Sequence, residues 1–66
     1  MQFSVKDMSC DHCARAITAA VAEVDPRASV EVDVDAKCVT VISDLQSGEI
    51  AKAIAKAGYT PLLRPS

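Results

Sequence analysis

A chain of 66 residues, half of them hydrophobic, is long enough for one small domain with a modest core, and we expect residues 1–66 to form a single domain. The net charge of −2 and the scattered basic residues exclude an extended nucleic-acid-binding patch. No apolar run approaches the roughly 20 residues that cross a membrane, and no signal peptide precedes the first strand pattern, so we expect a cytoplasmic protein without membrane insertion.

The chain begins with a strand pattern followed by a helix pattern. In residues 2–6, Phe3 and Val5 alternate with polar residues, which is typical of a half-buried strand. In residues 14–24, apolar side chains repeat at helical spacing. Asp25-Pro26 ends this helix, because proline disfavours the helical conformation in the residue before it. The residues on the apolar face of the helix are Cys13, Ile17, Ala20, Val21 and Val24.

A hairpin of two strands occupies the middle of the chain. Valines alternate with acidic residues in residues 30–35, so this strand has one apolar side. Residues 35–38 form a short connection between the strands. In the return strand Val39 and Val41 face the core, and the residues between and after them face outward.

A second helix and a short last strand complete the pattern. The apolar residues of this helix stand at i, i+3, i+4 and i+7, and they are Ile50, Ala53, Ile54 and Ala57. Ser47 is the expected N-cap, with Gln46 and Asp44 as alternatives. Gly58 stands at the C′ position, where a left-handed residue ends many helices. Residues 61–64 form a strand whose proline suits the edge of a sheet.

The order of these elements predicts an α+β fold of the ferredoxin-like type, βαββαβ, with two helices on one face of a four-stranded antiparallel sheet. The strand directions place three connections at one end of the sheet: the loop before the first helix, the hairpin connection, and the turn at Gly58-Tyr59. Tyr59 and Cys38 are therefore expected at the same end as residues 8–13.

The segment Met8-Ser9-Cys10-Asp11-His12-Cys13 carries the chemistry. Two cysteines separated by two residues can turn both thiolates toward one point, and thiolates are soft ligands suited to Cu(I). We expect Cys10 on the loop and Cys13 in the first helical turn, where unpaired N–H groups and the helix dipole favour a negative sulfur. Three cysteines, an odd count, do not indicate a secreted disulfide framework. Cys10 and Cys13 are the candidate metal ligands, with a redox pair as the alternative.

Three neighbouring residues have other expected roles. Met8 is expected to plug the core beneath the site rather than to bind metal through its thioether. His12 falls on the outer side of the turn, so a solvated imidazole is favoured over a metal ligand. Cys38 alternates away from Val39 and is expected to be a partly exposed bystander, with a ligand role only in a dimer or cluster.

Together these features resemble the heavy-metal-associated domain family, in particular its stand-alone bacterial copper chaperones. The matching stretches are Met8-Ser9-Cys10-x-x-Cys13, the valine-rich hairpin and Ala57-Gly58-Tyr59, and the likeness covers almost the whole chain. The resemblance implies Cu(I) held by the two cysteines in near-linear coordination. It also implies that Tyr59 shields the metal and hydrogen-bonds toward a sulfur. Asp7 departs from the family motif, which usually has glycine there, and places a negative charge beside the site.

The resemblance favours a copper chaperone rather than an enzyme. Its implied recipient is the metal-binding domain of a copper P-type ATPase or a copper-responsive regulator, reached through shared three-coordinate intermediates. The expected protein is a monomer without metal and can form a metal-bridged dimer. Two alternatives stay open: sequestration or sensing of Ag(I), Au(I), Hg(II) or Zn(II) at the same thiols, and thiol-disulfide redox chemistry. The redox alternative is disfavoured because a thioredoxin-like fold needs a longer chain.

Overall fold

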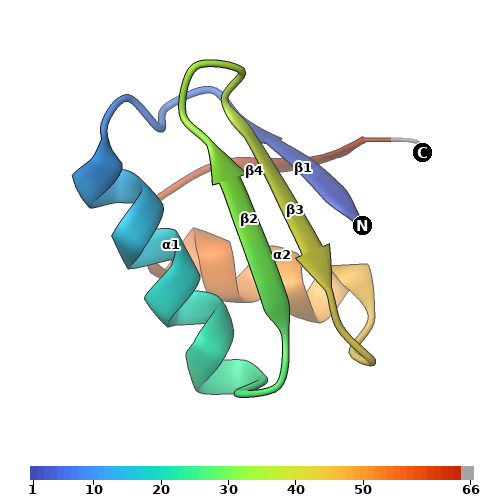
Figure 1. The fold of residues 1–66 in the computed structure, drawn as a ribbon. Coiled ribbons are helices and arrows are strands. Elements are labelled where there is room, and N and C mark those ends of the chain that lie inside the picture. Colours follow the sequence, from blue (N-terminus) through green and yellow to red (C-terminus); the bar gives the residue numbers. More distant parts are fainter. Residues whose placement is uncertain (65–66) are drawn as a thin grey trace.

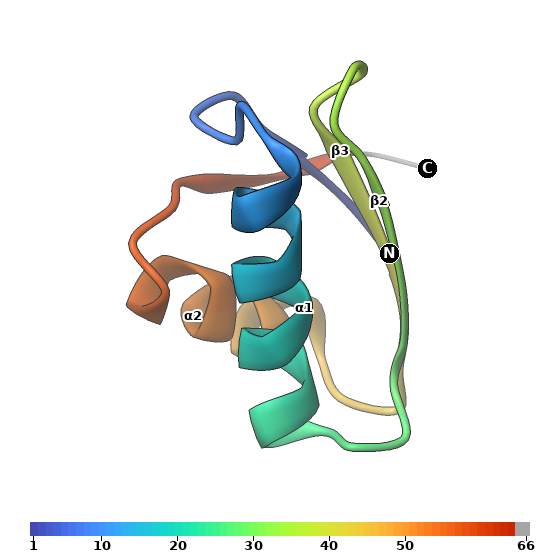
Figure 2. The same cartoon turned by 60° about the vertical axis from the view of Figure 1, so that its left-hand side comes forward.

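The computed structural model describes residues 1–64, which form six elements in the order βαββαβ (Figure 1). The elements are β1 (Gln2–Val5), α1 (Asp11–Val24), β2 (Ser29–Asp33), β3 (Cys38–Ile42), α2 (Ser47–Lys56) and β4 (Pro61–Arg64). Figure 2 shows two layers, with both helices on one side of the sheet and none on the other. This arrangement confirms the predicted ferredoxin-like fold.

The sheet has the strand order β2-β3-β1-β4, and every neighbouring pair is antiparallel. The central strands are β3 and β1, joined by pairs such as Phe3 with Val39. The last strand, β4, lies at an edge, where its first residue Pro61 pairs with Val5. An edge position suits proline because no further strand lies outside β4 to need a hydrogen bond from the missing N–H. The predicted edge strand is thereby confirmed.

The hydrophobic core lies between the sheet and the helices. It is filled by aliphatic side chains and a single phenylalanine, as expected of a chain with two aromatic residues. The fully buried residues are Phe3, Val5, Met8, Ile17, Val21, Val39, Val41, Ile50 and Ile54. Burial of this apolar surface supplies the main driving force for folding, and the same residues set the position of both helices over the sheet.

The apolar stripes of both helices were predicted one turn too long. Val24 is 46% exposed and Ala57 is also exposed, whereas the stripe residues before them are buried or partly buried. Both residues stand at the C-terminal end of their helix, where they border the groove between α1 and α2 instead of facing the sheet. The apolar spacing in the sequence therefore continues one turn beyond the part of each helix that is buried.

Two element boundaries near the cysteines also differ from the prediction. Helix α1 begins at Asp11 rather than at residue 14, because Cys10 has extended backbone and its carbonyl accepts the Ala14 N–H at 3.2 Å. Cys38 belongs to β3, where it pairs with Ser4, and not to the hairpin connection.

The hairpin connection itself is shifted toward the N-terminus of the chain. Val34 lies in the turn instead of the strand. The Asp33 carboxylate accepts the Ala36 N–H at 3.1 Å, and Lys37 takes a left-handed conformation with φ of 54°. These two local features close the turn before Cys38 and let it enter the ladder.

At the start of α2 the N-cap is Gln46, one of the predicted alternatives to Ser47. Within residues 1–64, neither helix combines the length and hydropathy that a membrane crossing needs.

Candidate metal-binding site

Three connections meet at one end of the sheet, as the strand directions predicted (Figure 1). The Val5 N–H donates to the Lys37 carbonyl at 2.9 Å, and the Lys37 ammonium donates to the Lys6 carbonyl at 3.2 Å. These bonds join the loop after β1 to the β2–β3 hairpin. On the other side of β1, Val5 pairs with Pro61, so the turn before β4 adjoins the same loop. Strand pairing therefore brings together segments that lie far apart in the sequence.

Cys10 and Cys13 hold their thiols side by side at the start of α1. Their Sγ atoms lie 3.4 Å apart, and both cysteines are free. Cys10 is exposed and stands at the N-cap, although its side chain makes no capping hydrogen bond. Cys13 is partly buried in the first helical turn. One sulfur is thus carried by a loop and the other by a helix, as predicted.

The surroundings of Cys13 favour its thiolate form. Its pKa falls from the ordinary value of 9.0 to about 7, mainly because the Tyr59 side chain hydrogen-bonds to it. Hydrogen bonds from the Ser9 backbone and from the Cys10 side chain lower the pKa further. Partial desolvation acts in the opposite direction, since it disfavours the charged sulfur. Cys13 is therefore partly ionised near neutral pH, and the thiolate is the form that binds metal.

Tyr59 is positioned by the end of α2. Gly58 has φ of +100° and occupies the predicted C′ position, where a residue with a Cβ would be strained. Its N–H donates to the Ala55 carbonyl at 3.0 Å. The following N–H, that of Tyr59, donates to the Ile54 carbonyl at 3.4 Å and completes a Schellman motif. The Tyr59 ring packs against the core, and its hydrogen bond to Cys13 raises the pKa of the Tyr59 hydroxyl.

Met8 belongs to the core rather than to the surface that carries the thiols. Its side chain is fully buried in the same cluster as Val5 and Ile17. Its N–H donates to the Val5 carbonyl at 3.1 Å, which turns the chain from β1 toward the cysteines. The prediction that Met8 fills the core is confirmed by this burial. Cys13 also packs against this cluster, so the core holds the first turn of α1 in place.

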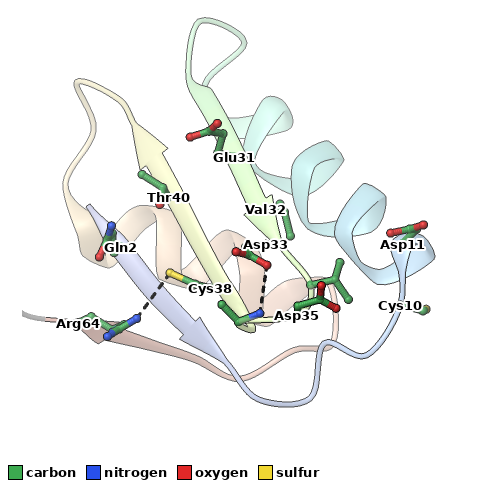
Figure 3. Close-up of a pocket in the computed structure, with 12 residues that line it drawn as sticks. Gln2, Cys10, Asp11, Glu31, Val32, Asp33, Asp35, Cys38, Thr40 and Arg64 are labelled. Atoms are coloured by element: carbon green, nitrogen blue, oxygen red, sulfur yellow. Dashed lines mark hydrogen bonds between the residues drawn. The ribbon is translucent and has the colours of Figure 1, made fainter.

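His12 and Cys38 do not join the cysteine pair in a ligand cluster within the described residues. His12 is exposed in the first turn of α1. Cys38 lies on the sheet face without helices, and Figure 3 shows its sulfur directed toward Arg64, whose Nη1 atom is 3.8 Å away. In the described part of the chain, no group of three or more Cys, His, Asp or Glu is arranged to hold a metal ion. Neither His12 nor Cys38 therefore completes a larger ligand cluster with the pair.

Cys10 and Cys38 both line one open hollow (Figure 3). It crosses the sheet face without helices, with Cys10 at one rim and Arg64 at the other. The charged residues that line it are Asp11, Glu31, Asp33, Asp35 and Arg64. Four carboxylates and one guanidinium give this surface a negative potential, across which the exposed thiol of Cys10 is approached from solvent.

Asp7 has a contact that the sequence did not reveal. Its Oδ1 atom accepts a hydrogen bond from the Thr60 N–H at 3.2 Å, which joins the loop before Cys10 to the turn after Tyr59. The sequence indicated only a negative charge near the site, because the partner lies 53 residues away. The available signal was an aspartate where the resembling family usually has glycine.

Comparison with known proteins places the cysteine pair and Tyr59 inside one region that matches a family model. Residues 2–60 match the family described as heavy-metal-associated domain. The copper chaperone CopZ of Enterococcus hirae is 38% identical over 61 residues, which cover 88% of each chain. The copper chaperone CopZ of Bacillus subtilis is 38% identical over 58 residues, covering 83% of this chain and 84% of that protein.

Solved structures share the fold over nearly the full length. A trimeric form of the copper chaperone Atx1 from Synechocystis PCC6803 has a TM-score of 0.90 at 41% identity, covering 92% of this chain and 97% of that one. A structure described as a gold binding protein has a TM-score of 0.94 at 36% identity, covering 97% and 98%. The likeness thus extends to proteins named for two different soft metals.

Proposed function

The chain belongs to the heavy-metal-associated domain family, and on that basis we propose that it is a Cu(I) chaperone. In this proposal Cys10 and Cys13 bind one Cu(I) ion and pass it to a partner by thiolate exchange. The observation that carries the proposal is the pair of free thiols 3.4 Å apart at an exposed helix N-terminus. Two relatives, each matched over most of its own length and most of this chain, are named copper chaperones.

The chemistry of the two sulfurs favours a monovalent soft ion. Thiolates select Cu(I) over hard cations, and two of them satisfy an ion that prefers few ligands. An ion held between two collinear sulfurs needs them farther apart than the 3.4 Å between these thiols. Loading therefore requires the sulfurs to separate. Cys10, exposed on the loop, supplies this movement while the helix holds Cys13.

Ligand exchange explains how a tightly bound ion is released. A two-coordinate ion leaves room for a third sulfur, so a cysteine of the partner can attach before Cys10 or Cys13 detaches. No step then requires a free metal ion. The exposure of Cys10 favours its replacement first, with Cys13 as the last ligand to leave. The recipient in this proposal is a metal-binding domain of a copper P-type ATPase or a copper-responsive regulator with similarly paired thiols.

A second function is favoured by one specific observation. A structurally similar protein, 36% identical, is described as gold binding. Au(I), Ag(I) and Hg(II) share the preference for two soft sulfurs, so the same pair would serve a protein that sequesters or senses one of them. Zn(II) is less suited, because structural zinc sites are four-coordinate, and residues 1–64 hold no cluster of three or more candidate ligands.

A metal competition experiment tests the proposal. The reduced chain is titrated under anaerobic conditions against a calibrated Cu(I) chelator, with Zn(II), Ag(I) and Au(I) in parallel. We expect one Cu(I) per chain, retained far more tightly than Zn(II). Transfer is then followed by mixing the loaded chain with a metal-free ATPase domain and separating the two. Failure to hold Cu(I) against the chelator contradicts the chaperone proposal, and retention of Au(I) alone supports the second function.

A further inference from the structure

The ladder between β1 and β4 ends at the pair of Val5 with Pro61. The Val5 N–H takes no part in that ladder, because it donates to the Lys37 carbonyl on the other side of β1. The next donor along the chain is the N–H of Thr60, just outside the strand. The Asp7 side chain accepts this N–H at 3.2 Å. A side-chain carboxylate thus joins the two segments just beyond the end of the backbone ladder.

The hydrogen bond between Asp7 and Thr60 lies next to Tyr59, whose side chain interacts with Cys13. On the N-terminal side of Tyr59, the Schellman motif ties the backbone to α2. On the C-terminal side, the bond to Asp7 ties the adjoining residue Thr60 to the loop that carries the cysteines. The position of the Tyr59 ring relative to Cys13 depends on both attachments, because α2 and the loop are separate parts of the fold.

Resting on the proposed function, we propose that Asp7 is a positioning residue, which holds the Tyr59 side chain near Cys13 through the Thr60 N–H and thereby slows release of the bound ion. Asp7 is exposed and acts through Tyr59 rather than on the metal. Glycine at this position would leave the Thr60 N–H to water and free the turn from the loop. Asparagine would keep the accepting Oδ1 atom but remove the charge.

A measurement on the metal-free protein tests the positioning directly. Tyr59 is the single tyrosine and the chain has no tryptophan, so near-ultraviolet circular dichroism in the tyrosine band reports on this ring. We expect Asp7→Gly to lose most of that signal while Asp7→Asn keeps it. The matched control is Asp35→Asn, which removes an exposed carboxylate from the hairpin connection at the same end. Far-ultraviolet spectra of all variants verify that the fold is retained.

Two outcomes of this measurement overturn the proposal. If Asp7→Gly keeps the parent signal, the contact does not position Tyr59. If Asp7→Asn behaves like Asp7→Gly, the charge is responsible and not the hydrogen bond. Because no metal is present, this arm gives its answer even if the parent fails to bind Cu(I), which would refute the proposed function separately.

The effect on exchange is measured by stopped-flow transfer of Cu(I) to the chelator. We expect Asp7→Gly and Tyr59→Phe each to accelerate release about twofold to tenfold, the range set by loss of one hydrogen bond. The double variant should release no faster than Tyr59→Phe alone, since the two changes remove the same interaction. Equal acceleration by Asp7→Gly in the Tyr59→Phe background would show that Asp7 does not act through Tyr59, and the proposal would be withdrawn.

Discussion

Cys13 and Cys38 are both partly buried cysteines in regular secondary structure, but their surroundings differ. Cys13 has a second thiol 3.4 Å away, and its interactions with the Tyr59 side chain and the Ser9 backbone lower its pKa. Cys38 has one guanidinium nitrogen at 3.8 Å and lies on the open face of the sheet. Exposure alone therefore does not distinguish a candidate ligand from a bystander. Convergent donors around the sulfur make that distinction, and fold topology supplies them.

The strongest test replaces one cysteine at a time. Cys10→Ser and Cys13→Ser should each abolish tight Cu(I) binding, because a single thiolate cannot form a two-sulfur site. Chelator competition under anaerobic conditions measures the loss, and Cys38→Ser is the matched control with the same change outside the pair. If either variant of the pair competes as well as the parent does, the assignment of these two ligands is wrong.

The element that positions Tyr59 beside Cys13 and the strand that holds Cys38 also differ in how their side chains pack in the core. Two isoleucine variants can show this difference. Ile54 is fully buried in α2, whose C-cap positions Tyr59, and Ile54→Ala should destabilise the protein by about 2–5 kcal/mol. Ile42 shares β3 with Cys38 but is 72% exposed, so Ile42→Ala is the matched control with a much smaller cost. Urea unfolding of both variants gives the free energies. Equal midpoints for Ile54→Ala and the parent would contradict the observed packing of α2.

The Tyr59 hydroxyl should account for a smaller part of the difference between the surroundings of Cys13 and those of Cys38. Tyr59→Phe removes the main cause of the low pKa of Cys13, so that pKa should rise from about 7 toward the ordinary value of 9.0. Fewer Cys13 thiols are then ionised at pH 7, and alkylation there should slow. Iodoacetamide rates measured against pH, in a Cys38→Ser background, check the shift. A pH profile identical to that of the parent would mean that the hydroxyl does not act on this sulfur.

The smallest effect is expected at Cys38. Its sulfur points across the open sheet face toward Arg64, so Cys38→Ser should retain one Cu(I) per chain at near-parent affinity. A change should appear only with excess copper, as fewer copper-bridged dimers or clusters. Stoichiometry and oligomer size measured through one copper titration decide the question. Loss of the first equivalent of copper would place Cys38 in the primary site and remove the contrast with Cys13.

The sequence by itself determined the order of the elements and the nature of the candidate ligands. Alternation of Phe3 and Val5 predicts a strand, and the spacing of Ile50 and Ile54 predicts a helix, because each pattern follows from the local repeat of the backbone. Gly58 marks a helix end since a left-handed residue is a local steric requirement. The cysteine spacing at a helix start belongs to the same class of local information.

The tertiary structure decided which groups surround those ligands. The contacts of Tyr59 with Cys13 and of Asp7 with Thr60 join residues that lie far apart in the sequence, and no local pattern encodes them. The structure also placed Cys38 within β3, since its pairing with Ser4 requires the neighbouring strand to be in register. Such contacts depend on how the helices and strands pack together, because the distance between two distant residues is set only when the chain between them has folded.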